Sequence, residues 1–506
     1  MRRNFPEANV AWLSNFTGLR RTVSALLCAS LAMFAPQSHG QADVASKVQL
    51  LTDALNRAQD QLSQAQRQLQ DLRQQIADLR VQVDSANRSA SASAEQQQLS
   101  SQVEALKENQ ALQASEIATH EQDKVESESK YPVKVTGMVL LNGFVNTNRV
   151  DMPATPTVAI SGAGTSGASL RQTVLGLDLL GPHLLGGHSH ADVRADFFGS
   201  TDSSNTGAYD AVGLLRLRTA HAALVWDSTE AWFSLDRPIL SANEPTSLTA
   251  VAVPPLAWSG NLWTWNPQVG VTHDFGASSA ERFRVEGALI DVADPPYAAN
   301  ASPAVYPAST AEQSRWPGVE ARVAFGSQED AGFRLGAGGY FAPHRTIYGS
   351  QFYSWAGTLD YRQPLPGRMQ FSGNFYRGAA LGGLGGGAYK DYGLGEDLDD
   401  PGSYYIRPFD AVGGWIEMKE RATERLEFNA ALGMDSVPAG ELRSYPAVAA
   451  STYQYLARTQ TFTGNAIYSP SAWLQFSLEY RRLESSSVNA PAASSNIIGV
   501  AAGYKF

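Results

Sequence analysis

The sequence predicts an all-β transmembrane barrel of about 16 antiparallel strands, preceded by an N-terminal α-helical coiled coil. Three observations support this fold class. Residues 132–506 contain 16 apolar-alternating runs with no helical periodicity between them. Short and long connections alternate between these runs, and charged residues keep to one face of most runs. Residues 41–120 instead repeat apolar residues at heptad spacing, which is the pattern of a coiled coil.

Residues 1–40 are predicted to be a signal peptide. Two arginines precede an apolar run over residues 23–34 that is too short to span a bilayer, and small residues flank a plausible cleavage point after Gly40. The single cysteine, Cys28, lies in this segment, so the exported chain is expected to contain no thiol or disulfide. The net charge of −10 argues against nucleic-acid binding.

Residues 41–120 are predicted to form a periplasmic coiled coil, followed by a polar linker over residues 121–131. The a positions are Val48, Leu55, Leu62, Leu69, Ile76 and Val83, and the d positions are Leu51, Ala58, Ala65, Leu72, Leu79 and Ala86. This narrow apolar seam suits partner helices better than a globular surface. The e and g positions are mostly glutamine, so no charge pattern selects a foreign partner and a homo-oligomer is expected.

The predicted barrel strands occupy most of residues 132–506, and no stretch after the signal segment is long enough for a transmembrane helix. The strands are expected at 132–146, 170–180, 189–199, 213–226, 230–240, 266–276, 281–292, 316–326, 331–343, 351–363, 367–380, 407–419, 423–436, 454–468, 471–484 and 495–506. Short connections such as 227–230 follow even-numbered runs, whereas long ones such as 147–169 and 381–406 follow odd-numbered runs. Outer-membrane barrels have this rhythm, with both termini in the periplasm.

The last run, NIIGVAAGYKF, alternates apolar and small residues and ends at Phe506. Such a strand closes outer-membrane barrels, and its aromatic end resembles the signal that the bacterial barrel-assembly machinery reads. That machinery is therefore an expected partner. The alternative for this run alone is the edge strand of a soluble β-sandwich.

Charged residues mark the lumen face of the predicted strands. In the run 281–292, Phe283 and Leu289 share one face, whereas Arg284 and Glu286 lie on the other. A charge facing lipid near the midplane costs roughly 2–4 kcal/mol, so the charged face should line the lumen. The charges assigned to the lumen in this way are Arg194, Arg284, Arg322, Arg334, Arg362, Lys419, Arg481, Asp192, Asp196, Glu286, Glu320, Asp360, Glu417, Glu427 and Glu479.

The alternation fails in one run, LLRLRTAHAALVW. Arg216 and Arg218 have the same parity as Ala220, Ala222 and Leu224, which would place two charges on the apolar face. Either a β-bulge shifts the pattern within this strand, or the lumen face is reversed there.

This combination of signal segment, coiled coil and 16-stranded barrel resembles the DcaP-like outer-membrane porin family. The resembling segments are VKVTGMVLLNGFVN from Val133, LRLRTAHAALVW from Leu215, NPQVGVTHDF from Asn266 and the terminal GVAAGYKF. The resemblance implies a trimer in outer-membrane lipid and the passage of small anionic organic solutes.

The third long connection, 241–265, is rich in proline and tryptophan. In many porins the corresponding loop folds inward and narrows the pore, so Trp258, Trp263 and Trp265 are candidates for lining a constriction or stacking on a ligand. An aromatic pin against the wall, or a trimer contact, explains these tryptophans equally well.

The predicted function is a porin, a passive diffusion channel for small hydrophilic solutes and in particular for anionic organic acids. Arginine can hold a carboxylate bidentately and stays charged at any relevant pH. The expected solute path is lined by Arg194, Arg216, Arg218, Arg284, Arg322 and Arg334, with Glu286 and Glu320 beside them.

Two other functions are open from the sequence: a sugar-type porin, which also carries an N-terminal coiled coil but has 18 strands, and a structural outer-membrane tether. An enzyme is not predicted, because none of the 8 histidines has a spacing that suggests a catalytic pair. No metal and no cofactor are predicted.

Overall fold

The computed structural model describes residues 132–506 apart from 200–212, 277–280, 297–307, 328–331, 347–348, 397–403 and 446–452, together with residues 74–75 and 77–78, which are helical. The predicted signal peptide, coiled coil and linker otherwise lie outside the described residues. Among the described residues, no helix is both long and apolar enough to cross a bilayer.

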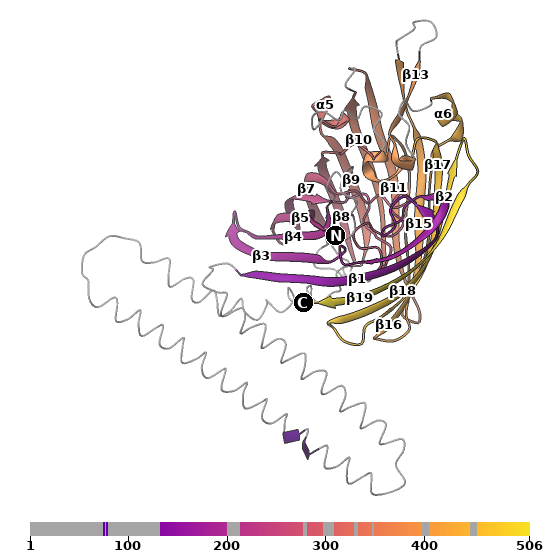
Figure 1. Ribbon diagram of the computed structural model, residues 1–506. Coiled ribbons are helices and arrows are strands. Elements are labelled where there is room, and N and C mark those ends of the chain that lie inside the picture. Colours follow the sequence, from indigo (N-terminus) through magenta and orange to yellow (C-terminus); the bar gives the residue numbers. More distant parts are fainter. Residues whose placement is uncertain are drawn as a thin grey trace, which may run out of the picture. The chain divides into compact units, whose positions relative to one another are not determined.

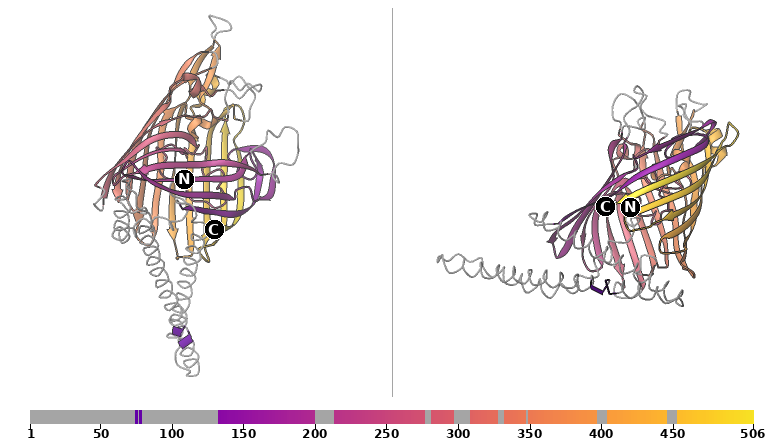
Figure 2. Two further views of the ribbon diagram at one scale, coloured as in Figure 1. Left: turned by 90° about the vertical axis from the view of Figure 1, so that its left-hand side faces the viewer. Right: turned by 60° about the horizontal axis from the view of Figure 1, so that its bottom comes forward.

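Sixteen antiparallel strands close into a single barrel (Figures 1 and 2). They are β1 (Val133–Val150), β3 (Val174–Leu184), β4 (Gly187–Gly199), β5 (Leu214–Val225), β6 (Thr229–Asp236), β7 (Asn266–Phe275), β8 (Glu281–Ile290), β9 (Gly318–Ser327), β10 (Arg334–Arg345), β11 (Gln351–Leu365), β12 (Met369–Ala379), β15 (Asp410–Arg421), β16 (Leu426–Ser436), β17 (Leu456–Tyr468), β18 (Leu474–Ser487) and β19 (Ala493–Lys505). The ring closes where β1 pairs with β19, from Met138 opposite Lys505 to Asn146 opposite Ile497. Each of these strands overlaps one predicted run, so the predicted fold class is confirmed for the barrel.

The prediction that residues 147–169 form one long loop is wrong in part. Strand β1 continues to Val150, and the chain returns as an additional strand, β2 (Ala159–Ser169), which pairs with the second half of β1. Strand β3 then pairs with the first half of β1. The sequence of β2, AISGAGTSGAS, has little β-propensity, so its extended conformation comes from the backbone of β1 beside it.

The barrel buries its polar side chains and exposes its apolar ones. On β8, Phe283 and Leu289 are 43% and 45% exposed, whereas the inward-facing Glu286 is 5% exposed. The same alternation holds on β9, where Val319 faces outward and Glu320 and Arg322 face inward. This distribution is the reverse of a water-soluble sheet and is the one that a lipid-facing barrel requires.

A β-bulge explains the irregular parity of β5. Arg194 on β4 lies opposite Thr219, but the next residue, Ala195, lies opposite Leu217, so Arg218 is the additional residue. Both Arg218 and Thr219 are therefore buried, whereas Leu217 is 51% exposed to the outside. The bulge returns the strand to its regular pattern, and the lumen face is not reversed.

The long connections lie together at one rim of the barrel. They contain α5 (Thr310–Ser314), the 3₁₀ turns η1 (Gly382–Leu384) and η2 (Gly387–Tyr389), the hairpin of β13 (Tyr392–Glu396) and β14 (Tyr404–Pro408), and α6 (Ala439–Ser444). Figure 1 shows α5, β13 and α6 at this rim. Tight turns, such as that between β3 and β4, join the strands at the opposite rim.

Candidate pore lining and constriction loop

The connection between β6 and β7 folds into the barrel. Leu240, Ala252 and Leu262 in this segment are 0% exposed, and most of the residues between them are also buried. Its contacts follow the inner wall almost completely around the barrel. Hydrogen bonds join it to Asn374 on β12, Glu417 on β15, Asn465 on β17, Glu479 on β18, Asn142 on β1 and Arg218 on β5. We call this connection, residues 237–265, the inner loop; it contains the predicted loop 241–265.

The inner loop begins at a wall carboxylate. The Ile239 N–H donates to Oε2 of Glu320 at 3.1 Å, and Glu320 is 1% exposed. Asn243 follows, and its side-chain carbonyl accepts hydrogen bonds from Arg334 and Arg362, both at 3.2 Å. Glu320 and Arg334, predicted to line a solute path, therefore contact the inner loop.

The middle of the inner loop is held by two more carboxylates. The Thr246 N–H donates to Oε1 of Glu417 at 2.6 Å, and the Ser247 hydroxyl donates to Oε2 of Glu479. Asn465 donates to the Thr246 carbonyl at 2.7 Å. Because Glu417 and Asn465 bond backbone groups of the loop, they fix the path of the chain and not only its attachment point.

Gln172 is an anchor that no sequence signal indicated. Its side chain is 0% exposed, its Oε1 accepts from the Val251 and Ala252 N–H groups at 2.8 and 2.9 Å, and its Nε2 donates to the Thr249 carbonyl at 2.9 Å. An uncharged residue between two strands has no pattern that would single it out. Its role becomes visible only when the loop is in place.

Trp258 is packed at the long-loop rim. Its ring stacks on Tyr389 with centroids 4.2 Å apart, and Tyr389 stacks on Tyr453 at 4.3 Å. Beside this stack, the ammonium group of Lys390 donates to the carbonyls of Ala388, Tyr453 and Leu456 at 2.7–3.0 Å, and burial lowers the pKa of Lys390 to about 7. This packing favours the interpretation of Trp258 as a pin against the wall.

Trp263 links Trp258 to Trp265 through edge contacts, with centroid distances of 6.1 and 5.7 Å. The ring of Trp265 lies 5.0 Å from the guanidinium carbon of Arg216 and 5.1 Å from that of Arg218. Trp265 therefore contacts the two arginines by cation–π interactions.

Arg216 and Arg218 share one carboxylate. Arg216 binds Asp196 through two hydrogen bonds, at 3.0 and 2.6 Å, and Arg218 lies 3.5 Å from the same carboxylate. The two arginines also donate to the loop carbonyls of Ala252 and Val251, both at 2.8 Å. The side chain of Arg218 is 1% exposed and that of Arg216 is 27% exposed, so Arg216 presents the accessible charge of this cluster.

The other predicted arginines are matched to acidic partners on the wall. Arg194 pairs with Asp178 at 2.5 Å, and Arg284 holds Asp274 through two bonds of 2.7 Å. Arg322 is 2% exposed and bonds to both Glu286 and Asp360. Glu286, another predicted path residue, is thus engaged by Arg322. In the Arg216–Arg218–Asp196 cluster two guanidinium groups share one carboxylate, as Arg282 and Arg284 share Asp274, but here the two arginines also bond carbonyls of the inner loop.

A closed barrel of 16 strands, polar inside and apolar outside, with the inner loop folded inward, has the architecture of a porin. The fold is similar to that of the outer membrane channel DcaP of Acinetobacter baumannii, with a TM-score of 0.58, 17% sequence identity, and coverage of 75% of this chain and 99% of that chain. The predicted resemblance is therefore confirmed at the level of the fold.

An anion-selective porin from Comamonas acidovorans is also similar, with a TM-score of 0.44, 12% identity, and coverage of 74% of this chain and 100% of that chain. No known family model and no curated protein matches the sequence.

Proposed function

We propose that this protein is an outer-membrane porin, a passive diffusion channel for small hydrophilic solutes. The inside-out burial of the strands carries this proposal: an apolar outer wall suits lipid, and a charged wall is tolerated only on the side away from lipid. The inner loop narrows the interior from within, as a size-selecting constriction would. A tether to the cell envelope would need neither the charged inner wall nor the inner loop.

The proposed solute class is small carboxylates. Arg216 combines a partly accessible guanidinium group with a neighbouring second arginine, and the two share the carboxylate of Asp196. A solute carboxylate can exchange with Asp196 at Arg216, which provides a weak site of the kind that conduction needs. The paired arginines elsewhere on the wall, Arg194, Arg284 and Arg322, serve as fixed dipoles along the same path.

A sugar-type porin is the second candidate, and two observations argue against it. The ring has 16 strands, fewer than the 18 of the sugar class. In addition, Trp258 is buried in an aromatic stack and Trp265 contacts two arginines. These contacts occupy the ring faces on which a sugar would stack.

Replacing Arg216 and Arg218 together by alanine is expected to lower the anion-to-cation permeability ratio by about threefold or more, because a focused charge changes the local ion concentration by at least that factor. The measurement is the zero-current potential of a planar bilayer in a salt gradient. Arg377→Ala removes a 45% exposed arginine near the rim and is the matched control. Because Arg218 is buried, Arg216→Gln alone serves as a milder variant.

Cation selectivity of the wild type, or an unchanged potential in both cluster variants, would remove these arginines from the mechanism. A liposome-swelling assay that compares sugars with dicarboxylates then decides between the two porin classes. Swelling with neither solute class would contradict the channel itself.

We expect the assembly to be a homotrimer, the state implied by the DcaP-like resemblance, with the coiled coil in the periplasm.

Recognition of the terminal aromatic residue by the barrel-assembly machinery is also proposed. Phe506 is 41% exposed, and its backbone pairs with Gly137 of β1 at 3.0 and 3.1 Å. This pairing leaves the ring available for recognition at the barrel surface.

Deleting residues 41–120 is expected to weaken the oligomer while leaving single-channel conductance nearly unchanged. The apolar heptad seam would supply association, whereas the groups proposed to line the solute path lie on the barrel strands. Oligomer mass in detergent and conductance in bilayers are measured on the same preparations. A large conductance change after the deletion would show that this segment plugs or gates the pore.

A further inference from the structure

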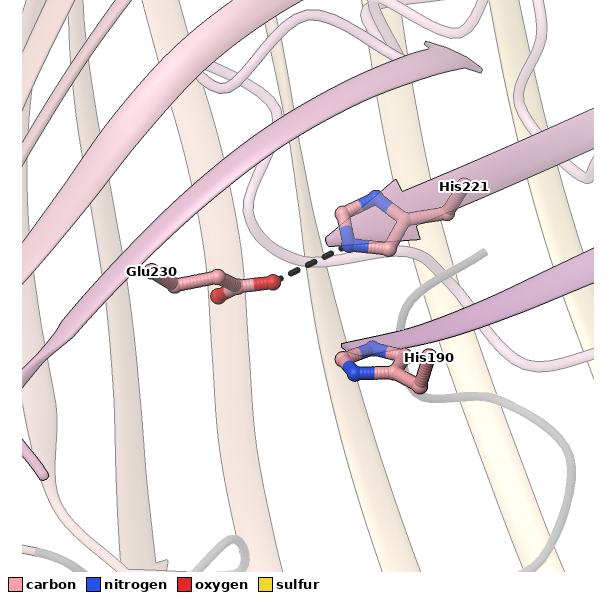
Figure 3. A group of neighbouring side chains, drawn as sticks. All are labelled: His190, His221 and Glu230. Atoms are coloured by element: carbon pink, nitrogen blue, oxygen red, sulfur yellow. Dashed lines mark hydrogen bonds and ion pairs between the residues drawn. The ribbon is translucent and has the colours of Figure 1, made fainter. Parts of the chain in front are cut away.

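Three side chains on neighbouring strands, outside the cluster described above, converge on the inner wall. They are His190 on β4, His221 on β5 and Glu230 on β6 (Figure 3). One nitrogen of each histidine and one oxygen of the glutamate lie within 4.8 Å of one another. We propose that these three residues bind a divalent transition-metal ion of the zinc type, which makes this wall of the barrel a metal site.

The β5 bulge creates this arrangement. Because Arg218 is the additional residue, odd-numbered positions after it face inward, and His221 is 9% exposed on the inner wall. In an unbulged strand His221 would face lipid. Ala223 on β5 lies opposite both His190 on β4 and Trp232 on β6, so its small side chain separates these two larger ones.

The distances suit a small ion with three protein ligands. Nε2 of His221 lies 3.0 Å from Oε1 of Glu230, and the two imidazole rings have centroids 5.8 Å apart. A tetrahedral zinc ion with bonds of about 2.0–2.1 Å holds its ligands roughly 3.4 Å apart. Small side-chain rotations therefore bring all three ligands around one ion, and a water molecule takes the fourth position.

The surroundings also favour a cation. Asp192 on β4 lies directly opposite His221 and adds a second carboxylate to this part of the wall. Nδ1 of His221 is buried and has no hydrogen-bond partner among the described residues, so the hydrogen bond to Glu230 does not satisfy this ring. Glu230 is 23% exposed, which gives an ion access from the lumen.

Two histidines and one carboxylate are borderline and hard ligands that bind zinc well. Calcium and magnesium prefer sites made only of oxygen. The expected selectivity is therefore zinc or cobalt over calcium or magnesium. This site is separate from the proposed solute path at Arg216, and its occupancy is measured without reference to conduction.

The test uses the full chain in detergent, purified without a histidine tag and stripped with a chelator. Titration calorimetry with Zn²⁺ is expected to show one equivalent per chain, and Co²⁺ should give the visible absorption bands of a four-coordinate ion. Each of His190→Gln, His221→Gln and Glu230→Gln should weaken Zn²⁺ binding by at least about tenfold. His273→Asn, which removes a histidine on β7 that bonds Thr229, should bind as the wild type does.

Equal Zn²⁺ binding in the wild type and in the three variants, or no stoichiometric binding by the wild type, would overturn the proposal and leave a histidine–glutamate hydrogen bond. Heat-modified mobility on gels checks that each variant forms a barrel. If His221→Gln does not fold, His190→Gln decides, because His190 is outside the His221–Glu230 hydrogen bond.

Discussion

Arg322→Met is expected to lower the free energy of unfolding of the barrel by about 3–5 kcal/mol, which is the cost of leaving buried charges without their partner. Arg322 is 2% exposed, and its guanidinium group bonds Asp360 at 2.8 and 2.7 Å and Glu286 at 2.5 Å. Both carboxylates are themselves buried, at 0% and 5% exposure. Without the arginine, two anions would face each other in a region from which water is largely excluded.

The measurement is urea unfolding of the barrel reconstituted in lipid vesicles. Arg377→Met is the control, since the side chains of the Arg377–Asp410 pair are 45% and 31% exposed and solvent-exposed pairs contribute about 0–1 kcal/mol. A triple variant that also carries Glu286→Gln and Asp360→Asn should recover part of the loss, because all three charges of this triad are then removed together. A loss below about 1 kcal/mol in Arg322→Met would show that water reaches this triad and that its pairing is weak.

Excising the inner loop is expected to raise single-channel conductance at least about twofold, because a barrel of 16 strands has an aqueous interior when nothing fills it. Asp236 and Asn266 are register partners on β6 and β7, so a short glycine–serine turn in place of residues 238–264 can rejoin the strands as a hairpin. The wall groups that bind the loop, such as Glu417 and Glu479, then face water in place of the loop backbone.

The matched control carries the same glycine–serine insertion in the tight turn between β3 and β4, at the opposite rim, where conductance should not change. Single-channel recordings in planar bilayers compare both with the wild type. Unchanged conductance after excision would mean that the inner loop is not the constriction. A wild type and an excised variant that both fail to conduct would contradict the porin function.

Strand positions could be predicted from the sequence because the strands obey a local rule. Lipid on one side and polar groups on the other force a residue-by-residue alternation, and residues such as Phe283, Arg284 and Glu286 display it directly. The alternation also located the irregularity at Arg218, although it could not distinguish a bulge from a reversed face. Only the register with β4 decides between these possibilities.

The partners of the lumen charges could not be predicted in this way. Asp360 lies 38 residues from Arg322, and Glu479 lies 232 residues from Ser247. Such pairs depend on barrel shear and on the path of the inner loop, and neither leaves a periodic trace in the sequence. The proximity of His190, His221 and Glu230 could not be predicted for the same reason, because they lie on three different strands and their sequence spacing matches no metal-binding motif. The sequence therefore predicted a mixture of acidic and basic residues in the lumen, and the structure adds which of them pair with one another.

The closure of the ring between β1 and β19 has a consequence for biogenesis. Every other junction joins strands that are close in the sequence, but this one joins the two extremes of the barrel. Until β19 arrives, β1 and the most recently added strand each present a row of unsatisfied amide and carbonyl groups, which are templates for aggregation. The chain can therefore associate with other copies of itself through the unpaired edge of β1 until β19 pairs with that edge. Its yield in the cell should depend on periplasmic chaperones more steeply than its final stability would suggest.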